Sequence, residues 1–326
     1  MRLTVSPARF PASHYGREVD VIKDKRNKIR VSSSDKIFDL INNTIMIIIV
    51  IVVAYPLYYV VIASLSDPDA VNAGDMIFFP IGGEGYLLNI EGYRRVFQDP
   101  RIWRGYFNTI IYAGFGTAFG VTITTLAAFS LSRRDLVGRG IITALFVFTM
   151  FFGGGLIPTF MVVRQLGLVN TREVMILLGS FSVFNLIITR AFFESTMSQE
   201  LQDAAFIDGC GNGRFFFSIA LTLSKAIVAV LTLFYVVGHW NSFFTALIYL
   251  NDVRLYPLQL VLRDILIGGQ MLIAEVTDMD AIGDAQRIAL SLRYAVIIVS
   301  SVPVLIMYPF VQKFFVRGVM IGALKG

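Results

Sequence analysis

The chain has 326 residues, of which 56% are hydrophobic and only 16% charged, and its mean hydropathy is +0.68. Soluble domains are less apolar and carry charge on about a quarter of their residues, so this composition excludes an ordinary soluble protein and indicates a membrane protein. In a membrane protein, the net charge of +5 indicates basic residues that orient the spans rather than a nucleic-acid-binding surface. The single cysteine excludes an internal disulfide and a cysteine-based zinc site.

Long apolar runs predict six membrane-spanning helices, because about 20 apolar residues cross a bilayer. The chain opens with a basic tail at 1–36, which lacks the pattern of a cleavable signal peptide. The rest, 37–326, reads as one transmembrane domain with its core at about 103–313. The six runs lie at about 40–64, 106–131, 140–163, 174–193, 224–250 and 292–312.

Three further features of the sequence predict a kink, a short surface helix and an amphipathic helix face. "GGGLIP" at Gly153 to Pro158 predicts a kink in the third run. Residues 90–100 read as a short surface helix before the second run. In 251–291, Leu258 and Val261 share one helix face with Leu262 and Ile265. That face either contacts an outside partner or covers the helix bundle.

Lysine and arginine predict the orientation. Of the 28 basic residues, 18 lie in the tail at 1–36, the turn after the second run, the segment 190–225 and the C-terminal end. The alternate loops hold the other ten. Because basic residues stay on the cytoplasmic side, both termini and the segment 190–225 are expected in the cytoplasm.

One stretch, "ELQDAAFIDGCGNGR" at 200–214, interrupts the apolar pattern. Its acids would cost on the order of ten kcal/mol in lipid, so we expect it to lie in water. Thr196 or Ser198 suits a helix N-cap, and Gly209 suits the helix end. The residues alone leave open a helical knob for another protein or an amphipathic helix on the membrane surface.

This stretch resembles the cytoplasmic loop of permease subunits in binding-protein-dependent ABC importers. "DAAFIDG" at 203–209 keeps the family's two alanines and its glycine, and "IAL" at 219–221 follows at the expected distance. Asp203 stands for the family's glutamate and Thr222 for its proline. "FFGGGLIPTFMVVRQLGLVNT", "FNLIITRAFFES", "GHWNSFFTALIYL" and "FVRGVMIGALKG" resemble the carbohydrate-uptake branch, closest to permeases for uronate-containing oligosaccharides.

The resemblance implies an all-α, type I ABC importer permease with six transmembrane helices in the bacterial plasma (inner) membrane. It also implies partners: two ATP-binding subunits, a second homologous permease, and an extracytoplasmic binding protein that delivers a carbohydrate. A coupling loop at about 194–222 would dock on an ATPase. The residues expected to couple are Glu200, Gln202, Asp203, Ala204, Ala205, Asp208 and Gly209.

The sequence has no phosphate loop of the form G-x-x-x-x-G-K-[ST]. We therefore expect no catalytic residue and no cofactor on this chain, with ATP and magnesium held by the partner subunits. With only His14 and His239 present, histidines cannot build a metal cluster.

Polar and aromatic residues inside two runs are candidates for the sugar path, since polar groups at membrane depth usually face the bundle interior. The alternative is hydrogen bonding between helices. The candidates are Asn185, Tyr235, His239, Trp240 and Asn241.

Two rival classes are an ion-coupled secondary transporter of a small polar solute and a membrane-embedded enzyme. The first normally needs acidic residues at membrane depth, which the six runs lack near their centres. The second needs clustered catalytic groups there. Neither explains the loop at 200–214.

Overall fold

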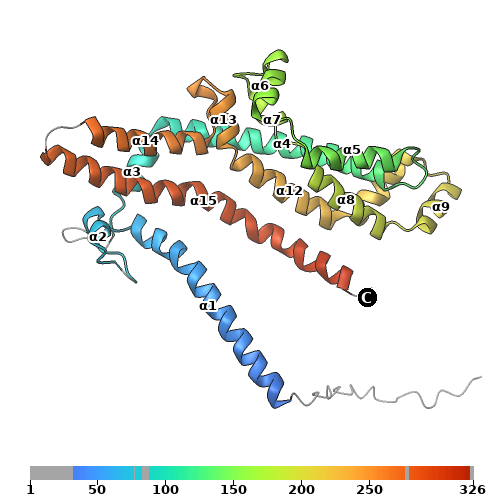
Figure 1. The fold of residues 1–326 in the computed structure, drawn as a ribbon, viewed down its shortest axis with the longest axis horizontal. Helices are drawn as coiled ribbons and strands as arrows, with labels where there is room; N and C mark the ends of the chain where they lie inside the picture. The colour runs from blue at the N-terminus through green and yellow to red at the C-terminus, as the bar shows by residue number, and fades with distance from the viewer. Residues whose placement is uncertain (1–31, 77, 83–87, 276–278, 324–326) are drawn as a thin grey trace, which may run out of the picture. The chain divides into compact units, whose positions relative to one another are not determined.

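A computed structural model describes residues 32–76, 78–82, 88–275 and 279–323, and every regular element in these ranges is a helix (Figure 1). The all-α prediction is therefore confirmed. The helices are α1 Ser33–Ser64, α2 Pro68–Ala73, α3 Glu91–Gln98, α4 Pro100–Ser132, α5 Arg139–Phe151, α6 Leu156–Gln165, α7 Arg172–Leu177, α8 Val183–Thr196, α9 Gln199–Ile207, α10 Asn212–Arg214, the π-helical η1 Phe215–Ala220, α11 Leu221–Leu223, α12 Lys225–Trp240, α13 Phe243–Tyr249, the 3-10 turn η2 Val253–Leu255, α14 Leu258–Glu275 and α15 Met279–Ala323.

The chain divides into two compact units, Met1–Tyr55 and Pro56–Gly326. The predicted basic tail lies, up to residue 31, outside the described residues. In the rest of the first unit, α1 is apolar on all sides from residue 45 onward, and its described side chains are exposed. A helix that is hydrophobic all round needs an apolar environment, which lipid supplies.

In the described residues, three helices are long and apolar enough to cross a bilayer: α1, α4 and the part of α15 from Gln286 to Ile306. Two bent pairs also pass the test together, α5 with α6 at 114° and Asn212–Leu223 with α12 at 83°, which gives up to five spans. The predicted kink after residue 151 is confirmed, since the helix stops at the glycine run and resumes at Leu156.

The predicted continuous helix over 174–193 is interrupted. α7 ends at Leu177 and α8 begins at Val183, and between them Gly179 takes a φ of +85°, which favours glycine. The hydroxyl of the buried Ser180 lies 3.1 Å from the carbonyl oxygen of Gly116 in α4. Contacts with a distant helix thus support this break, and a count of apolar residues could not predict it.

Helix α4 is the central element of the second unit, with α8, α12 and α14 packed along it. Asp99 caps its N-terminus by accepting from the backbone N–H of Arg101 at 2.8 Å, and Pro100 fits the first helical position. Gly116 lets α12 approach closely: a Cβ built there would lie 2.4 Å from Nε2 of His239.

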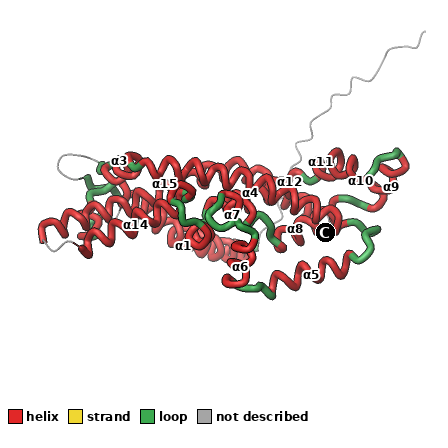
Figure 2. Tube along the Cα trace, turned by 90° about the horizontal axis from the view of Figure 1, so that it is seen from above, coloured by secondary structure: helices red, strands yellow, loops and turns green. Residues whose placement is uncertain are grey.

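The two ends of α4 carry different groups of elements. Within this unit, α3 lies near its first residues, while α5, α8 and α9 gather near its last residues (Figures 1 and 2). The predicted surface helix before the second run is confirmed as α3. The apolar face of α14, with Leu258 and Val261, is buried in a cluster with Ile102 of α4 and Val296 of α15. The chain's own helices therefore cover that face.

Candidate functional site

The acidic stretch forms the short helix α9, at the end of α4 that carries Arg133 and Arg134. Ser198 caps the helix, because its Oγ accepts from the backbone N–H of Leu201 at 3.3 Å. Gly209 ends it in the left-handed conformation with a φ of +75°. The predicted start and end of this helix are thus confirmed.

The inner face of α9 is anchored in the protein. Ala205 is 8% exposed and belongs to a buried cluster with Phe129 of α4, Phe193 of α8 and Phe215 of η1. Gln202, one turn earlier, is 7% exposed. These two of the predicted coupling residues therefore lie on the inner face of α9.

The outer face of α9 is open. Glu200, Asp203, Ala204 and Ile207 are exposed and recur at the spacing of one helix face. Asp208 and Gly209, just after the helix, are exposed as well. Ile207 is 86% exposed although it is fully apolar. An exposed apolar side chain that shares a helix face with acidic residues is typical of a surface that binds another protein.

Arg133, at the end of α4, holds α9 from one side. Its guanidinium carbon lies 5.0 Å from the ring centroid of Phe206 in α9, within the range of a cation–π contact. The same guanidinium donates two hydrogen bonds of 2.8 Å to Asp135 and thereby holds the pKa of that carboxyl below its usual value. In the sequence, Arg133 counted only as an orientation signal, because nothing local marks its contact with residue 206.

The candidate sugar-path residues are mostly buried and hydrogen-bonded within the chain. The Tyr235 hydroxyl lies 2.6 Å from Oγ1 of Thr124 and accepts from the backbone N–H of Ser182 at 3.3 Å. Nε2 of the buried His239 lies 3.3 Å from Oγ of Ser180. Both side chains of α12 therefore hold the non-helical segment between α7 and α8 against α4.

The other three candidates differ in exposure. Trp240 is buried and its Nε1 donates to the carbonyl oxygen of Ser300 at 3.0 Å. Asn185 is buried near the start of α8. Asn241, at the end of α12, is exposed. The hydrogen-bond partners of these candidates lie on several different elements, and the role of the five residues in a sugar path stays a prediction.

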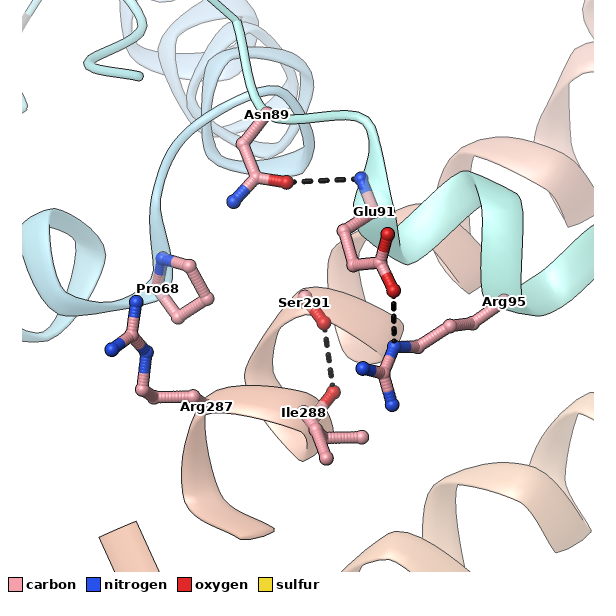
Figure 3. Close-up of a pocket in the computed structure, with 7 residues that line it drawn as sticks. All are labelled: Pro68, Asn89, Glu91, Arg95, Arg287, Ile288 and Ser291. Atoms are coloured by element: carbon pink, nitrogen blue, oxygen red, sulfur yellow. Dashed lines mark hydrogen bonds and ion pairs between the residues drawn. The ribbon is translucent and has the colours of Figure 1, made fainter. Parts of the chain in front are cut away.

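A polar pocket of about 360 Å³ lies at the other end of the second unit, between α2, α3 and α15 (Figure 3). Its charges are balanced inside the chain. Glu91 pairs with Arg95 at 2.8 Å, and Arg287 lies 3.5 Å from Asp67 and 3.3 Å from Asp69. Among the described residues, no group of three or more histidines, cysteines or carboxylates could hold a metal ion.

No protein-family model matches the chain, but individual relatives do. It is 35% identical to the polygalacturonan/rhamnogalacturonan transport system permease protein YtcP of Bacillus subtilis, over 90% of this chain and 99% of the relative. It is 26% identical to the trehalose/maltose transport system permease protein MalG of Thermococcus litoralis, over 86% of this chain and 94% of the relative.

A solved structure agrees with these relatives. A chain from a bacterial ABC transporter involved in the import of the acidic polysaccharide alginate matches with a TM-score of 0.74 and 30% identity, over 87% of this chain and 98% of that chain. The 35% identity to YtcP over 90% of this chain places the two proteins in one family. The chain therefore belongs to the permease subunits of carbohydrate ABC importers, which are proteins of the inner membrane.

Proposed function

We propose that this permease carries an oligosaccharide through six spans, with both termini in the cytoplasm, and that α9 is its contact with an ATP-hydrolysing subunit. The observation that carries the proposal is the two-sided character of α9. Its inner face is fixed by Ala205 in the phenylalanine cluster, and its outer face presents Ile207 with acids around it. Because α9 packs against α4 and α8 on one side and is exposed on the other, it can transmit a movement of a bound partner to these two helices.

The proposed cycle is alternating access. Two ATP-binding subunits hold ATP and magnesium, and their closure moves α9 of this chain and the matching helix of a second, homologous permease. Because packed helices shift between discrete arrangements, the spans would change from inward-facing to outward-facing as rigid bodies. In this scheme Ala205 holds the helix in place, and Gln202 lies on the inner face beside it. The residues that meet the partner are Glu200, Asp203, Ala204, Ile207, Asp208 and Gly209.

The proposed substrate is an oligosaccharide with uronate units, delivered by an extracytoplasmic binding protein. The support comes from the substrates for which two similar proteins are named, polygalacturonan/rhamnogalacturonan and alginate. Asn241 is the exposed member of the candidate sugar-path residues, so it is the first of them to substitute in transport assays.

The test of coupling is Ile207→Asp in the complete importer, reconstituted in proteoliposomes. We expect uptake and substrate-stimulated ATP hydrolysis to fall by at least about tenfold, since a charge replaces an apolar contact at an interface, while the chain itself still folds. Ile90→Asp is the matched control, because Ile90 is also exposed but precedes α3 near the other end of α4. Normal coupled transport by Ile207→Asp would contradict the role of α9.

The test of substrate is uptake by the same proteoliposomes, supplied with the cognate binding protein. Galacturonate oligosaccharides are expected to be taken up, and neutral maltodextrins of equal length are not. Equal uptake of both would contradict the uronate proposal and leave the coupling proposal intact.

A further inference from the structure

A second feature lies beside α9 and is not used by the coupling proposal. A polar pocket of about 250 Å³ opens between the turn after α4, the end of α8 and the first residues of α9. It is lined by three arginines, Arg134, Arg139 and Arg190, and by one acid, Glu194. The pocket therefore has an excess of two positive charges.

The single acid is shared by two of the arginines. One oxygen of Glu194 lies 3.0 Å from Nε of Arg190 and 3.4 Å from Nη1 of Arg139. Arg190 is further fixed by a hydrogen bond of 2.8 Å from its Nη1 to Oγ1 of Thr143. Arg134 is exposed, and its side chain has no hydrogen bond or ion pair among the described residues.

The N-terminus of α9 adds to this positive character. Ser198, Gln199 and Gln202 of α9 line the pocket, so the helix begins at its wall. The first backbone N–H groups of a helix lack partners within it and carry partial positive charge, which suits an anion.

Gln202 points independently to a ligand. Its side chain is 7% exposed and lines the pocket, yet its amide makes no hydrogen bond with any residue that the structure describes. Its amide atoms are not among the fully buried unpartnered atoms of the described residues, so they keep accessible surface at the pocket wall. An oxygen-rich group in the pocket would accept from this amide and from the arginines together.

We propose that the pocket binds a phosphate monoester group. Its excess of two positive charges matches the charge of about −1.5 to −2 on such a group at neutral pH, and arginine is the side chain best suited to bind phosphate oxygens in pairs. Its volume suits a small anion rather than a drug-sized molecule, for which pockets of roughly 300–1,000 Å³ are usual.

Binding would brace α9. The anion would join the N-terminus of α9 to Arg134 of the turn before α5, to Arg139 at the start of α5 and to Arg190 of α8. Since α9 is a nine-residue helix with one side open, this added tie would limit its motion relative to α4. The phosphate group could belong to a lipid headgroup or to a free phosphate, and the experiment separates these two sources.

The experiment uses the complete importer in phosphatidylcholine nanodiscs, with hydrogen exchange of the Gln199–Gln202 amides as the readout. The probes are inorganic phosphate, with potassium chloride at equal ionic strength as the blank, and nanodiscs that also contain phosphatidic acid. We expect slower exchange with at least one probe. Phosphate acting alone identifies a free ligand, and phosphatidic acid acting alone identifies a lipid headgroup.

Three variants decide whether the pocket is responsible. Arg134→Gln should raise the half-protective probe concentration about tenfold, the equivalent of one charge-assisted hydrogen bond. Glu194→Gln removes the competing acid and should lower that concentration about threefold or more. Arg214→Gln should leave it unchanged, because Arg214 is also exposed and follows α9 but does not line the pocket.

The gain expected from Glu194→Gln cannot arise from misfolding, so the test does not depend on a loss of function alone. Absence of protection by both probes would overturn the proposal. Protection that Arg134→Gln and Arg214→Gln change equally would also overturn it.

Discussion

At the residue scale, Gly116 sets how closely α12 approaches α4. A Cβ at this position would lie 2.4 Å from Nε2 of His239, whose ring is buried and cannot move freely. We expect Gly116→Ala to destabilise the permease by about 1–3 kcal/mol. At Gly114, where a Cβ would meet nothing within 4 Å, alanine should be neutral or stabilise by up to about 1 kcal/mol.

The midpoint of thermal unfolding of the detergent-purified permease measures the stability of both variants. Adding His239→Ala to Gly116→Ala should recover part of the loss, because the smaller side chain makes room for the new methyl group. Equal midpoints for the two glycine variants would show that this contact does not limit the packing of α12.

Also at the residue scale, Arg133 should stabilise α9 more through Phe206 than through Asp135. The side chain of Asp135 is 63% exposed, and exposed ion pairs contribute about 0–1 kcal/mol, whereas a cation–π contact at a partly buried site contributes up to about 2 kcal/mol. Arg133→Gln should therefore speed hydrogen exchange in α9 more than Asp135→Asn does. Equal effects of the two variants would assign the stabilisation to the ion pair, because Arg133→Gln removes both contacts and Asp135→Asn only one.

At the element scale, the two alanines of α9 should behave differently because they lie on opposite faces. Ala205→Leu adds volume to the buried cluster with Phe193 and Phe215, so we expect it to lower the stability of the chain by about 1–3 kcal/mol. Ala204→Leu adds volume on the exposed face, so it should leave stability unchanged and reduce substrate-stimulated ATP hydrolysis. Thermal unfolding and ATPase assays on the same preparations separate the two effects. Equal loss of stability would contradict the orientation of α9.

Elements differ in how far the sequence predicts them, and the difference has a physical cause. The cap at Ser198 and the end at Gly209 depend on neighbouring residues, so local chemistry was enough to predict them. The buried face of α9 depends on Phe129 and Phe215, which are distant in the chain or lie beyond the turn, so periodicity left it open. The break between α7 and α8 depends on Gly116 in the same way.

At the scale of the whole molecule, composition and long apolar runs predict a helical membrane protein, and the structure and relatives confirm that class. The finer arrangement needs lipid and partner chains, because residues 45–53 of α1 are all apolar and all exposed. The polar pocket lined by Arg134 and Arg190 was missed for another reason. These arginines are 56 residues apart in sequence, and each one alone indicates only membrane orientation.

The outer face of α9 is proposed to contact an ATP-hydrolysing subunit. The most direct measurement is site-specific crosslinking from Ile207→Cys in a Cys210→Ser background, where it is the only cysteine, followed by mass spectrometry of the native membrane complex. Ile90→Cys in the same background is the control. We expect a crosslink from residue 207 to a subunit with a phosphate loop, and none from residue 90. Crosslinks only to lipid or to another copy of this chain, from a complex without an ATPase, would contradict it.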